Sequence, residues 1–363
     1  MSQRRILFIA PHRPNRSPSQ RYRFEQFHDA LAASGYDYDY SYLISEEDDK
    51  ALYSKGNLTK KAQMLARSFK LRQEDVKRAD RYDIIFVQRE AFMTGTTLFE
   101  RKFARSKAKL VYYFDDSIWL SNVSDANRSL NFLKDPRKTA RIIQVSDHVI
   151  AGNAYLADYA LKFNPKVSVI PTCIDTKRYQ PKVHCETQGK VTIGWTGSIT
   201  TIQHFKRAEQ VLLRIKEKYG PKVSFLVIGD PSFEHEGLAI KGQAWNAETE
   251  TEDLLLMDIG IMPLPDDEWS KGKCGFKGLQ YMGSGIPTIM SPVGVNTEIV
   301  QDGVNGLLAF GEDEWFDKLC SLIEDASLRE TLGAAGRRTV EEKYSVEVNA
   351  PKRLEVFDRV LGE

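Results

Sequence analysis

The chain has 363 residues, of which 42% are hydrophobic and 28% charged, and its net charge at pH 7 is +1. A chain of this length is longer than one that typically folds around a single hydrophobic core, so we expect two domains. The balanced charge argues against a nucleic-acid partner. The four cysteines have no Cys-x-x-Cys spacing, which argues against a metal site or a disulfide framework and favours the cytoplasm.

Short apolar segments typical of buried strands recur through the first half of the chain. They lie at 4–10, 83–88, 109–115, 147–152 and 166–171, with amphipathic helical segments between them at 19–34, 57–79, 130–146 and 153–163. Strands that are apolar throughout and alternate with helices indicate a parallel sheet covered on both faces.

The same alternation restarts at residue 190. Further strands are expected at 190–197, 222–230, 257–264, 286–292 and 305–310, with helices near 203–219, 275–284 and 312–325 and in the tail from 327 onward. We therefore predict an α/β fold of two doubly wound, Rossmann-like domains that face each other across a cleft. Ligands of such sheets bind at the carboxyl ends of the strands, so we expect the active site in that cleft.

The predicted domain boundaries follow from the same pattern. We expect an N-terminal domain at 1–172, a polar linker with flanking prolines at 173–189, and a C-terminal domain at 190–345. The last segment, 346–363, is expected to be a helix that is able to pack back on the N-terminal domain.

The stretch GWTGSITT at 194–201 follows a predicted strand and precedes a helix. Backbone N–H groups of a glycine turn at a helix N-terminus stabilise a phosphate, so Gly197, Ser198 and Thr200 are candidate donor-binding residues. The alternative is an ordinary strand–helix turn with a capping hydroxyl. The stretch is not Gly-x-Gly-x-x-Gly, which argues against a dinucleotide site.

A second glycine-rich stretch begins at residue 272 and leads into a helix near Phe276. Lys273 and Lys277 supply positive charge beside the flexible Gly275 and the helix N-terminus, an arrangement that suits a diphosphate. The alternative is that both lysines are solvated surface residues.

Asp115 and Asp116 follow the strand at 109–115, where a parallel sheet places its active-site residues. A carboxylate there could accept or orient the proton of an attacking hydroxyl, so both are candidate catalytic residues. The alternative is that one of them caps the following segment.

The loop after the first strand, APHRPNRSPSQRYR at 10–23, is unusually cationic. His12, Arg13, Arg16 and Arg21 are candidate acceptor-binding residues, and their charge predicts an anionic substrate. Solvated arginines on a loop are the alternative.

The segment from Lys50 to Arg81 contains ten lysines and arginines but only three acids, and the region continues basic to residue 109. A basic amphipathic helix can lie on an anionic membrane surface, so we predict peripheral attachment to the inner face of the cell membrane through residues 50–109. A charged outer face of an ordinary helix is the alternative.

Three blocks of sequence resemble retaining GT-B glycosyltransferases of the family 4 type, also called glycosyltransferase group 1. The segment 149–181 is similar to the family's region ending in Pro-Asn-Gly-Val-Asp, and LLLMDIGIMPLP at 254–265 resembles its Ala-Asp-Ile strand. The most specific block, 278–309, follows the family's pattern from Glu-Ala-Met-Ala-x-Gly-x-Pro to its Gly-x-Asn-Gly turn. RSPSQRYRFEQFHDAL at 16–31 resembles divergent bacterial surface-polysaccharide members.

This resemblance implies a nucleotide-sugar donor bound by the C-terminal domain and a glycan or lipid-linked acceptor bound by the N-terminal domain. It also implies retention of configuration, no cofactor and no metal, because cations and helix dipoles stabilise the leaving diphosphate. Lys277 is then expected to act in catalysis.

The chain departs from the family pattern in its Glu-x7-Glu pair and in the loop WTGSITTIQHF at 195–205, where the family's Arg and Lys are absent. The Glu-x7-Glu pair falls on Gly272 and Gln280, where Gln280 can still hydrogen-bond ribose but Gly272 has no side chain to hold the sugar. Two alternatives therefore stay open: a non-catalytic nucleotide-sugar-binding protein and a GT-B nucleotide-sugar epimerase.

Overall fold

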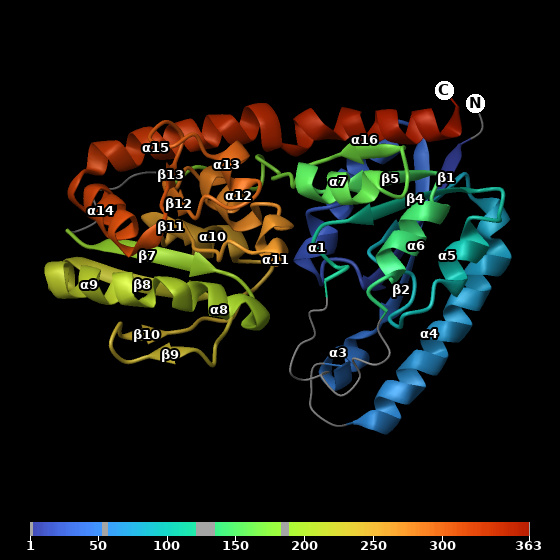
Figure 1. Cartoon of the computed structure of the whole chain (residues 1–363), viewed down its shortest axis with the longest axis horizontal. Coiled ribbons are helices and arrows are strands. Elements are labelled where there is room, and N and C mark those ends of the chain that lie inside the picture. The colour runs from blue at the N-terminus through green and yellow to red at the C-terminus, as the bar shows by residue number, and fades with distance from the viewer. Residues whose placement is uncertain (1–2, 53–56, 121–134, 183–188, 363) are drawn as a thin grey trace. The chain divides into compact units, whose positions relative to one another are not determined.

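The computed structural model describes residues 3–52, 57–120, 135–182 and 189–362 (Figure 1). The chain forms two compact units: unit 1 comprises Met1–Pro171 and Asn349–Glu363, and unit 2 comprises Thr172–Val348. The described part of the segment 173–189, predicted as a linker, belongs to unit 2, because Cys173, Ile174 and Tyr179 are buried there. Residues 183–188 lie outside the described residues.

Unit 1 is built on a six-stranded parallel sheet with the order β2-β1-β3-β4-β5-β6. The strands are β1 (Arg4–His12), β2 (Tyr36–Ile44), β3 (Ile84–Gln88), β4 (Lys109–Phe114), β5 (His148–Ala151) and β6 (Val167–Val169). Five of them coincide with predicted apolar segments. The exception is β2, an edge strand that the apolar pattern does not reveal because its sequence, YDYDYSYLI, alternates tyrosine with aspartate.

The helices of unit 1 connect these strands. They are α1 (Pro18–Arg21), α2 (His28–Ala33), α3 (Glu46–Leu52), α4 (Leu58–Arg78), α5 (Leu98–Phe103), α6 (Lys138–Val145) and α7 (Ala154–Leu161), with 3-10 turns at Glu25–Phe27 and Ala79–Arg81. The single helix expected at 19–34 is divided, because the backbone leaves the helical region at Phe24, whose φ is −145°. Residues 130–134 of the helix expected at 130–146 lie outside the described residues.

The last helix, α16 (Val346–Leu361), completes unit 1. Its Val356 and Phe357 are buried in the same apolar cluster as Ile6 and Phe8 of β1. The carboxylate of Asp358 accepts a hydrogen bond of 2.6 Å from Arg4. The C-terminal segment is therefore part of the core of unit 1.

Unit 2 is built on a five-stranded parallel sheet with the order β13-β12-β11-β7-β8. The strands are β7 (Val191–Thr196), β8 (Val223–Ile228), β11 (Ile259–Met262), β12 (Thr288–Met290) and β13 (Leu307–Leu308). All five were predicted, whereas the short antiparallel pair β9 (Glu234–His235) and β10 (Ile240–Lys241) was not. The α/β fold of two parallel, doubly wound sheets is confirmed.

The helices of unit 2 lie on both faces of its sheet. They are α8 (Ile202–Phe205), α9 (Glu209–Tyr219), α10 (Glu250–Leu255), α11 (Glu268–Lys271), α12 (Phe276–Gly283), α13 (Asn296–Ile299), α14 (Gly311–Glu324) and α15 (Ala326–Thr339), with 3-10 turns at Ile199–Thr201, Lys206–Ala208 and Gly220–Lys222 and a π turn at Val340–Tyr344.

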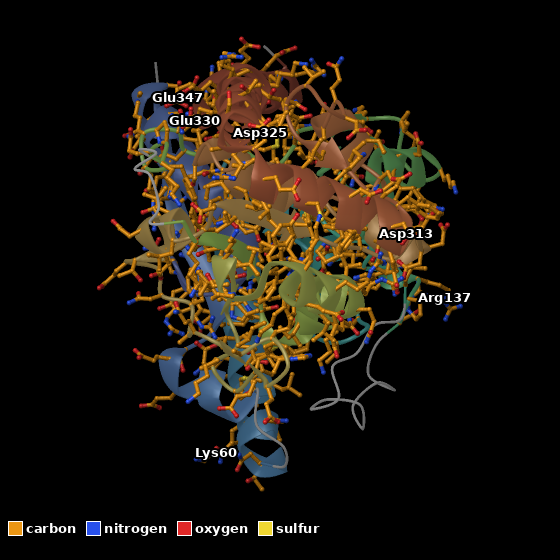
Figure 2. All side chains as sticks on the ribbon, turned by 90° about the vertical axis from the view of Figure 1, so that its left-hand side faces the viewer. Lys60, Arg137, Asp313, Asp325, Glu330 and Glu347 are labelled. Atoms are coloured by element: carbon orange, nitrogen blue, oxygen red, sulfur yellow. The ribbon has the colours of Figure 1, made fainter. Side chains whose placement is uncertain are left out.

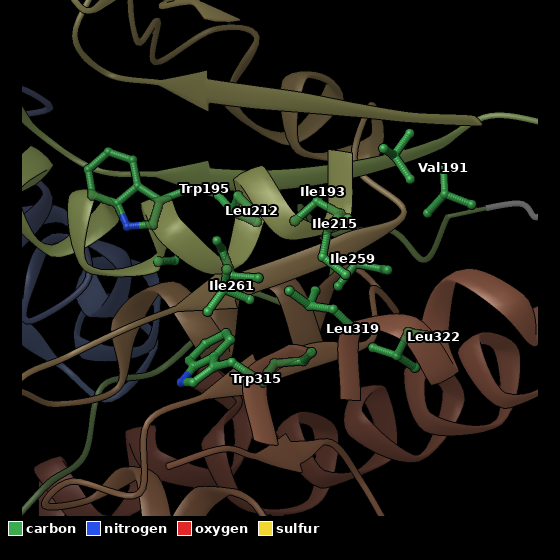
Figure 3. Close-up of a cluster of buried hydrophobic side chains, with 14 of the residues drawn as sticks. Val191, Ile193, Trp195, Leu212, Ile215, Ile259, Ile261, Trp315, Leu319 and Leu322 are labelled. Atoms are coloured by element: carbon green, nitrogen blue, oxygen red, sulfur yellow. The ribbon is translucent and has the colours of Figure 1, made fainter. Parts of the chain in front are cut away.

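One buried cluster holds α9 and α14 to the sheet. Figure 3 shows side chains of β7 and β11, including Trp195 and Ile261, packed against Leu212 of α9 and against Trp315 and Leu319 of α14. Alternate residues of both strands enter this cluster, as expected for parallel strands that are buried on both faces. Within the described residues, none of the helices has the length and apolar composition that crossing a membrane requires.

In both sheets the order of the strands reverses at the strand that comes first in the chain. In unit 1, β1 lies between β2 and β3, and in unit 2, β7 lies between β8 and β11. Open parallel sheets bind ligands beyond the carboxyl ends of the strands at such reversal points. A ligand is therefore expected beside the loops after β1, β3 and β7.

Candidate functional site

The turn after β7 is shaped by glycines that approach each other closely. Gly229, whose φ is +123°, has no room for a side chain, because a Cβ there would lie 1.8 Å from the carbonyl oxygen of Gly197. Ser198 and Thr200 are exposed, and their hydroxyl oxygens are 3.0 Å apart. Gly197, Ser198 and Thr200 thus form one exposed polar turn at the reversal point of unit 2.

The lysines of the second glycine-rich stretch lie beside this turn. The Nζ of Lys277, in the first turn of α12, is 5.5 Å from the centre of the Trp195 ring, and Trp195 is only two residues before Gly197. Lys273 lies 5.3 Å from the ring of Trp269 in α11. Two segments that are distant in the sequence therefore meet at the end of β7.

His204 of α8 lies within the field of both lysines. Its side chain is buried, and this burial, followed by the charges of Lys277 and Lys273, lowers the pKa of His204 to about 4. Lys273, Lys277 and the helix that follows the 197–201 turn are consequently close in space. A local excess of positive charge with exposed hydroxyls is suited to a phosphate or diphosphate.

Gly275 lets α12 begin at this place. Its φ is +65°, and a Cβ would lie 2.1 Å from Cδ1 of Ile299, so both the backbone and the packing require glycine. Phe276 is then the first residue of α12. The predicted donor residues Gly275 and Phe276 thus set the position of Lys277.

Gln280 does not point into an open site. It is 2% exposed, and its Nε2 donates hydrogen bonds to the Tyr179 hydroxyl (2.8 Å) and to Oε1 of Glu250 (3.1 Å). Both amide hydrogens are therefore used within unit 2, so Gln280 has no N–H left to donate to a ribose hydroxyl. The reason is that α12 turns this position inward, toward the buried segment around Tyr179.

Glu250, at the start of α10, is a buried carboxylate that the sequence did not reveal. It is 4% exposed and accepts a hydrogen bond of 3.2 Å from the indole of Trp245 in addition to that from Gln280. Arg178 is 3.6 Å away. No pattern around Glu250 distinguishes it from the other acids at 248–253, so only the structure identifies it.

In unit 1, the two aspartates after β4 have different surroundings. Asp115 is 5% exposed and binds Ser19 (2.7 Å), Arg89 (2.8 Å) and Arg23 (3.3 Å). Burial opposes ionisation, but the charges of Arg89 and Arg23 and the Ser19 hydroxyl outweigh it and lower the pKa of Asp115 to about 2. Asp115 is therefore a permanent anion and a weak base.

Asp116 lies nearer to the surface than Asp115 and also accepts a hydrogen bond from Arg89. A carboxylate that is partly accessible can reach a substrate hydroxyl, whereas Asp115 is enclosed by its partners. The structure therefore separates the pair, and Asp116 is the better candidate for contact with an acceptor.

Arg89, which joins the two aspartates, was not among the sequence candidates. Its φ is +62°, in the left-handed region that is strained for a residue with a side chain, and its backbone N–H donates to the carbonyl of Tyr113 at 2.8 Å. The sequence could have identified Arg89, because it follows the buried strand β3 just as Asp115 follows β4.

The cationic loop after β1 is organised around Asp49 of α3. Arg13 and Arg16 (2.8 Å) both bind this carboxylate, and Nδ1 of His12 is 3.9 Å from it. One carboxylate thus faces two guanidinium groups, so the positive charge of the pair is only partly compensated. Arg21 is 6% exposed and lies against the ring of Tyr22, so it is not a solvated loop residue.

His12 is neutral at pH 7. Burial is the main cause that lowers the pKa of His12 to about 4. The charge of Asp49 opposes this shift, and the charges of Arg16, Arg89 and Arg13 add to it. The backbone of His12 is held by Gln20, whose side chain accepts from its N–H and donates to its carbonyl, each at 2.8 Å. The structure thus gathers His12, Arg13, Arg16 and Arg89 at the reversal point of unit 1.

Comparisons with known proteins agree with this architecture. Residues 190–325 match the family described as Glycosyl transferases group 1. The curated proteins give no match by sequence.

Solved structures match along the whole chain. A glycosyltransferase from Rickettsia africae is 14% identical with a TM-score of 0.68, and the match covers 100% of both chains. HepE from Anabaena in complex with UDP-glucose is 15% identical (TM-score 0.67), with 98% of this chain and 99% of HepE covered. Sucrose-phosphate synthase from Thermosynechococcus elongatus is 14% identical (TM-score 0.65), with 98% and 99% covered.

The two doubly wound sheets and their likeness to these structures define a protein of the GT-B fold. Within unit 2, residues 190–325 are similar to the glycosyltransferases of group 1.

Proposed function

We propose that this glycosyltransferase moves a sugar from a nucleoside diphosphate to a hydroxyl of a glycan or lipid-linked acceptor, with retention and without a metal. The observation that carries the proposal is the convergence of Lys273 and Lys277 on the turn that follows β7. Positive charge fixed at this position stabilises the leaving diphosphate as negative charge develops on it.

A uridine nucleotide is the first donor to test. HepE of Anabaena, which shares the fold, was solved with UDP and with UDP-glucose. A thermal-shift screen with UDP-, GDP-, ADP- and CMP-sugars identifies the base, because a ligand at 100 times its dissociation constant adds about 2.7 kcal/mol of stability. We expect the largest shift with the UDP-sugar.

Lys277 provides the sharpest test of the diphosphate site. Lys277→Ala should weaken binding of the best nucleotide by about tenfold or more, because a charge-assisted contact with phosphate is lost. The matched control is Lys271→Ala, since Lys271 lies in the adjacent helix α11 and pairs with Glu268 at 3.0 Å. Equal affinities of the two variants in calorimetry would refute the diphosphate site.

Retention and metal independence are tested on the same preparation. We expect the product to keep the anomeric configuration of the donor, as read by the anomeric proton in NMR. We expect the rate to be unchanged by EDTA, because Lys273 and Lys277 provide the charge that a metal provides elsewhere. An inverted product or a rate abolished by EDTA would each contradict the corresponding part of the proposal.

A second candidate function is a non-catalytic nucleotide-sugar-binding protein. Two observations favour it: Gly272 has no side chain with which to hold the sugar, and the amide hydrogens of Gln280 are used within unit 2. Tight binding of a nucleotide sugar without hydrolysis or transfer, even with membrane extracts as acceptor, would support this alternative.

The proposed role in surface-polysaccharide synthesis includes docking on the inner face of the membrane. Lys70 and Lys77 are exposed cations of α4, and Arg81 is exposed in the 3-10 turn that follows it. Lys60 projects from the N-terminal end of α4 (Figure 2). Residues 53–56 of the basic region lie outside the described residues. Exposed cations of this kind attract anionic lipid headgroups.

Vesicle sedimentation tests this docking. Lys70→Glu with Lys77→Glu should reduce co-sedimentation with vesicles that contain phosphatidylglycerol, whereas Lys222→Glu with Lys241→Glu, an equal charge change on exposed residues of unit 2, should not. If both pairs behave like the unaltered protein, the membrane role is excluded.

A further inference from the structure

Much of the positive charge of α4 is directed into unit 1. Arg67 binds Asp48 of α3, Arg78 binds Asp75 at 2.8 Å, and Arg72 is fully buried. A buried arginine loses its hydration, and such a group is retained only where several hydrogen bonds replace the lost water. The partners of Arg72 therefore indicate why an arginine is retained in the interior at this position.

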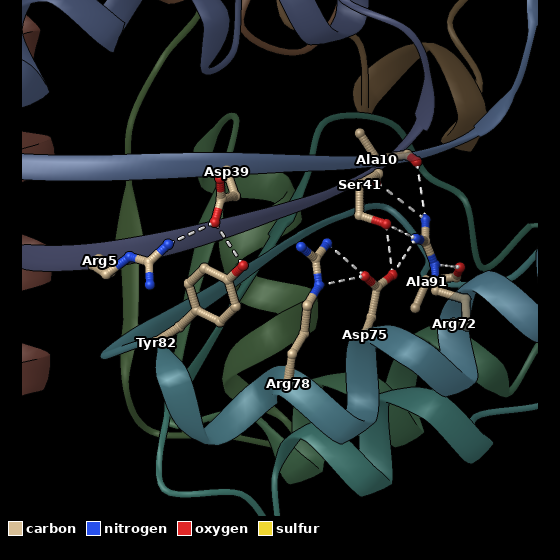
Figure 4. Close-up of polar contacts among 9 residues, drawn as sticks. All are labelled: Arg5, Ala10, Asp39, Ser41, Arg72, Asp75, Arg78, Tyr82 and Ala91. Atoms are coloured by element: carbon tan, nitrogen blue, oxygen red, sulfur yellow. Dashed lines mark hydrogen bonds and ion pairs between the residues drawn. The ribbon is translucent and has the colours of Figure 1, made fainter.

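Figure 4 shows that the guanidinium of Arg72 joins segments that follow one another in the sheet. Its Nη2 donates to the carbonyl of Ala10 in β1 (3.1 Å), and its Nε donates to the carbonyl of Ala91, just after β3 (2.6 Å). Its Nη1 donates to the Ser41 hydroxyl of β2 (2.7 Å) and to Asp75 (2.8 Å). One planar group thus fixes the ends of three strands.

The carbonyls of Ala10 and Ala91 lie close in the sequence to His12 and Arg89, two of the residues gathered at the reversal point of unit 1. Ala10 precedes His12 by two residues, and Ala91 follows Arg89 by two residues. The N–H of Ala91 is itself held by Glu100 at 2.9 Å. The distance between the loop after β1 and the loop after β3 therefore depends on the side chain of Arg72.

The second of these loops is also held from its other side. Lys138 of α6 pairs with Glu90 at 2.8 Å and donates to the carbonyls of Phe92 and Thr94 (2.7 Å). The left-handed backbone of Arg89 is strained, and such a conformation persists only where its surroundings determine it. Arg72 and Lys138 supply such surroundings.

We propose that Arg72 is a positioning residue of the acceptor site: its guanidinium holds His12 and Arg89 at the separation that the acceptor requires. This inference rests on the proposed glycosyl transfer and on the expectation, implied by the family resemblance, that the N-terminal domain binds the acceptor. Arg72 contacts no substrate, so its effect is exerted through the two loops.

A lysine at position 72 provides a stringent test. It keeps the charge but has one nitrogen in place of the planar fork, so it cannot hold the carbonyls of Ala10 and Ala91 together with Ser41 and Asp75. The matched control is Arg78→Lys, because Arg78 binds the same Asp75 but neither loop carbonyl.

The expected kinetic result is a selective loss. Arg72→Lys should raise the KM for the acceptor by about tenfold or more, since small displacements of binding groups have effects of this size. Affinity for the nucleotide, which unit 2 binds, should change less than twofold, and Arg78→Lys should leave both parameters near those of the unaltered protein. An unchanged acceptor KM, or an equal effect of both variants, would overturn the proposal.

Hydrogen exchange gives a readout that needs no turnover. Amides of residues 10–16 and 89–94 should exchange faster in Arg72→Lys than in Arg78→Lys, and equal exchange would overturn the positioning role even if no acceptor is found. Faster exchange without any transfer by the unaltered protein would instead contradict the proposed function alone. If Arg72→Lys does not fold, Ser41→Ala, which removes one contact of Arg72 and no charge, is measured in the same way.

Discussion

Asp115 and Asp116 are adjacent in the sequence but differ in burial and in hydrogen-bond partners. Asp115 is enclosed by Arg89, Arg23 and Ser19, whereas Asp116 is partly accessible. The sequence places both at the end of β4 but says nothing of their partners, because those come from the loops after β1 and β3. The two carboxylates should therefore respond differently to substitution.

We predict that Asp115→Ala lowers the free energy of unfolding by about 3 kcal/mol, because it leaves the buried Arg23 and the partly buried Arg89 without their shared partner. Asp116→Ala should change this free energy much less and should mainly lower the transfer rate. Urea unfolding and initial rates measure both effects. Similar unfolding curves for the two variants would show that the difference in burial has no energetic consequence.

At the scale of elements, the start of α12 depends on one glycine. Gly275 combines a φ of +65° with the close approach of Ile299. A misplaced α12 also displaces Lys277, so the packing of this helix and the charge at the end of β7 are coupled.

We predict that Gly275→Ala is destabilising by about 1–2 kcal/mol for the left-handed backbone and by about 1–3 kcal/mol more for the overpacking. Gly303→Ala is the control, because Gly303 has a φ of +74° but no atom within 4 Å of its Cβ position. Thermal unfolding and nucleotide affinity are the measurements. Equal destabilisation in both variants would contradict the packing argument.

Elements with continuous apolar sequences could be predicted, and elements whose formation depends on tertiary contacts could not. The ten predicted strands are all present because each has an apolar sequence and most are largely buried, whereas β2 and the β9–β10 pair lie outside this pattern. Glycines and lysines marked the loop before α12. Arg89, Glu250 and Asp49 were not found because their importance lies in contacts with distant segments.

At the scale of the whole molecule, four histidines are kept neutral. Burial is the largest cause that lowers the pKa of His12, His28, His148 and His204 to about 4. An unfolded histidine titrates near 6.5, so between pH 6.5 and 4 the unfolded chain binds more protons than the folded chain. The histidine contribution to stability is complete above pH 6.5 and is lost as the pH falls toward 4.

We predict that the urea midpoint decreases steadily from pH 7 to pH 4.5. In the structure, Nε2 of His148 lies 2.9 Å from the hydroxyl oxygen of Ser168. His148→Gln removes one titrating group but keeps a polar partner for Ser168, so it should reduce the dependence of the urea midpoint on pH. A midpoint that stays constant over this range would contradict the burial of the histidines in the neutral form.

The return of the chain to unit 1 at Asn349 has a consequence for biosynthesis. A ribosome releases residues in order, so unit 2 is complete before the side chains of Val356 and Phe357 exist, and the core of unit 1 has to wait for the last segment. During this interval the nascent N-terminal half exposes apolar surface and is a natural client for chaperones. The first half of the protein to be made is therefore the last to finish folding.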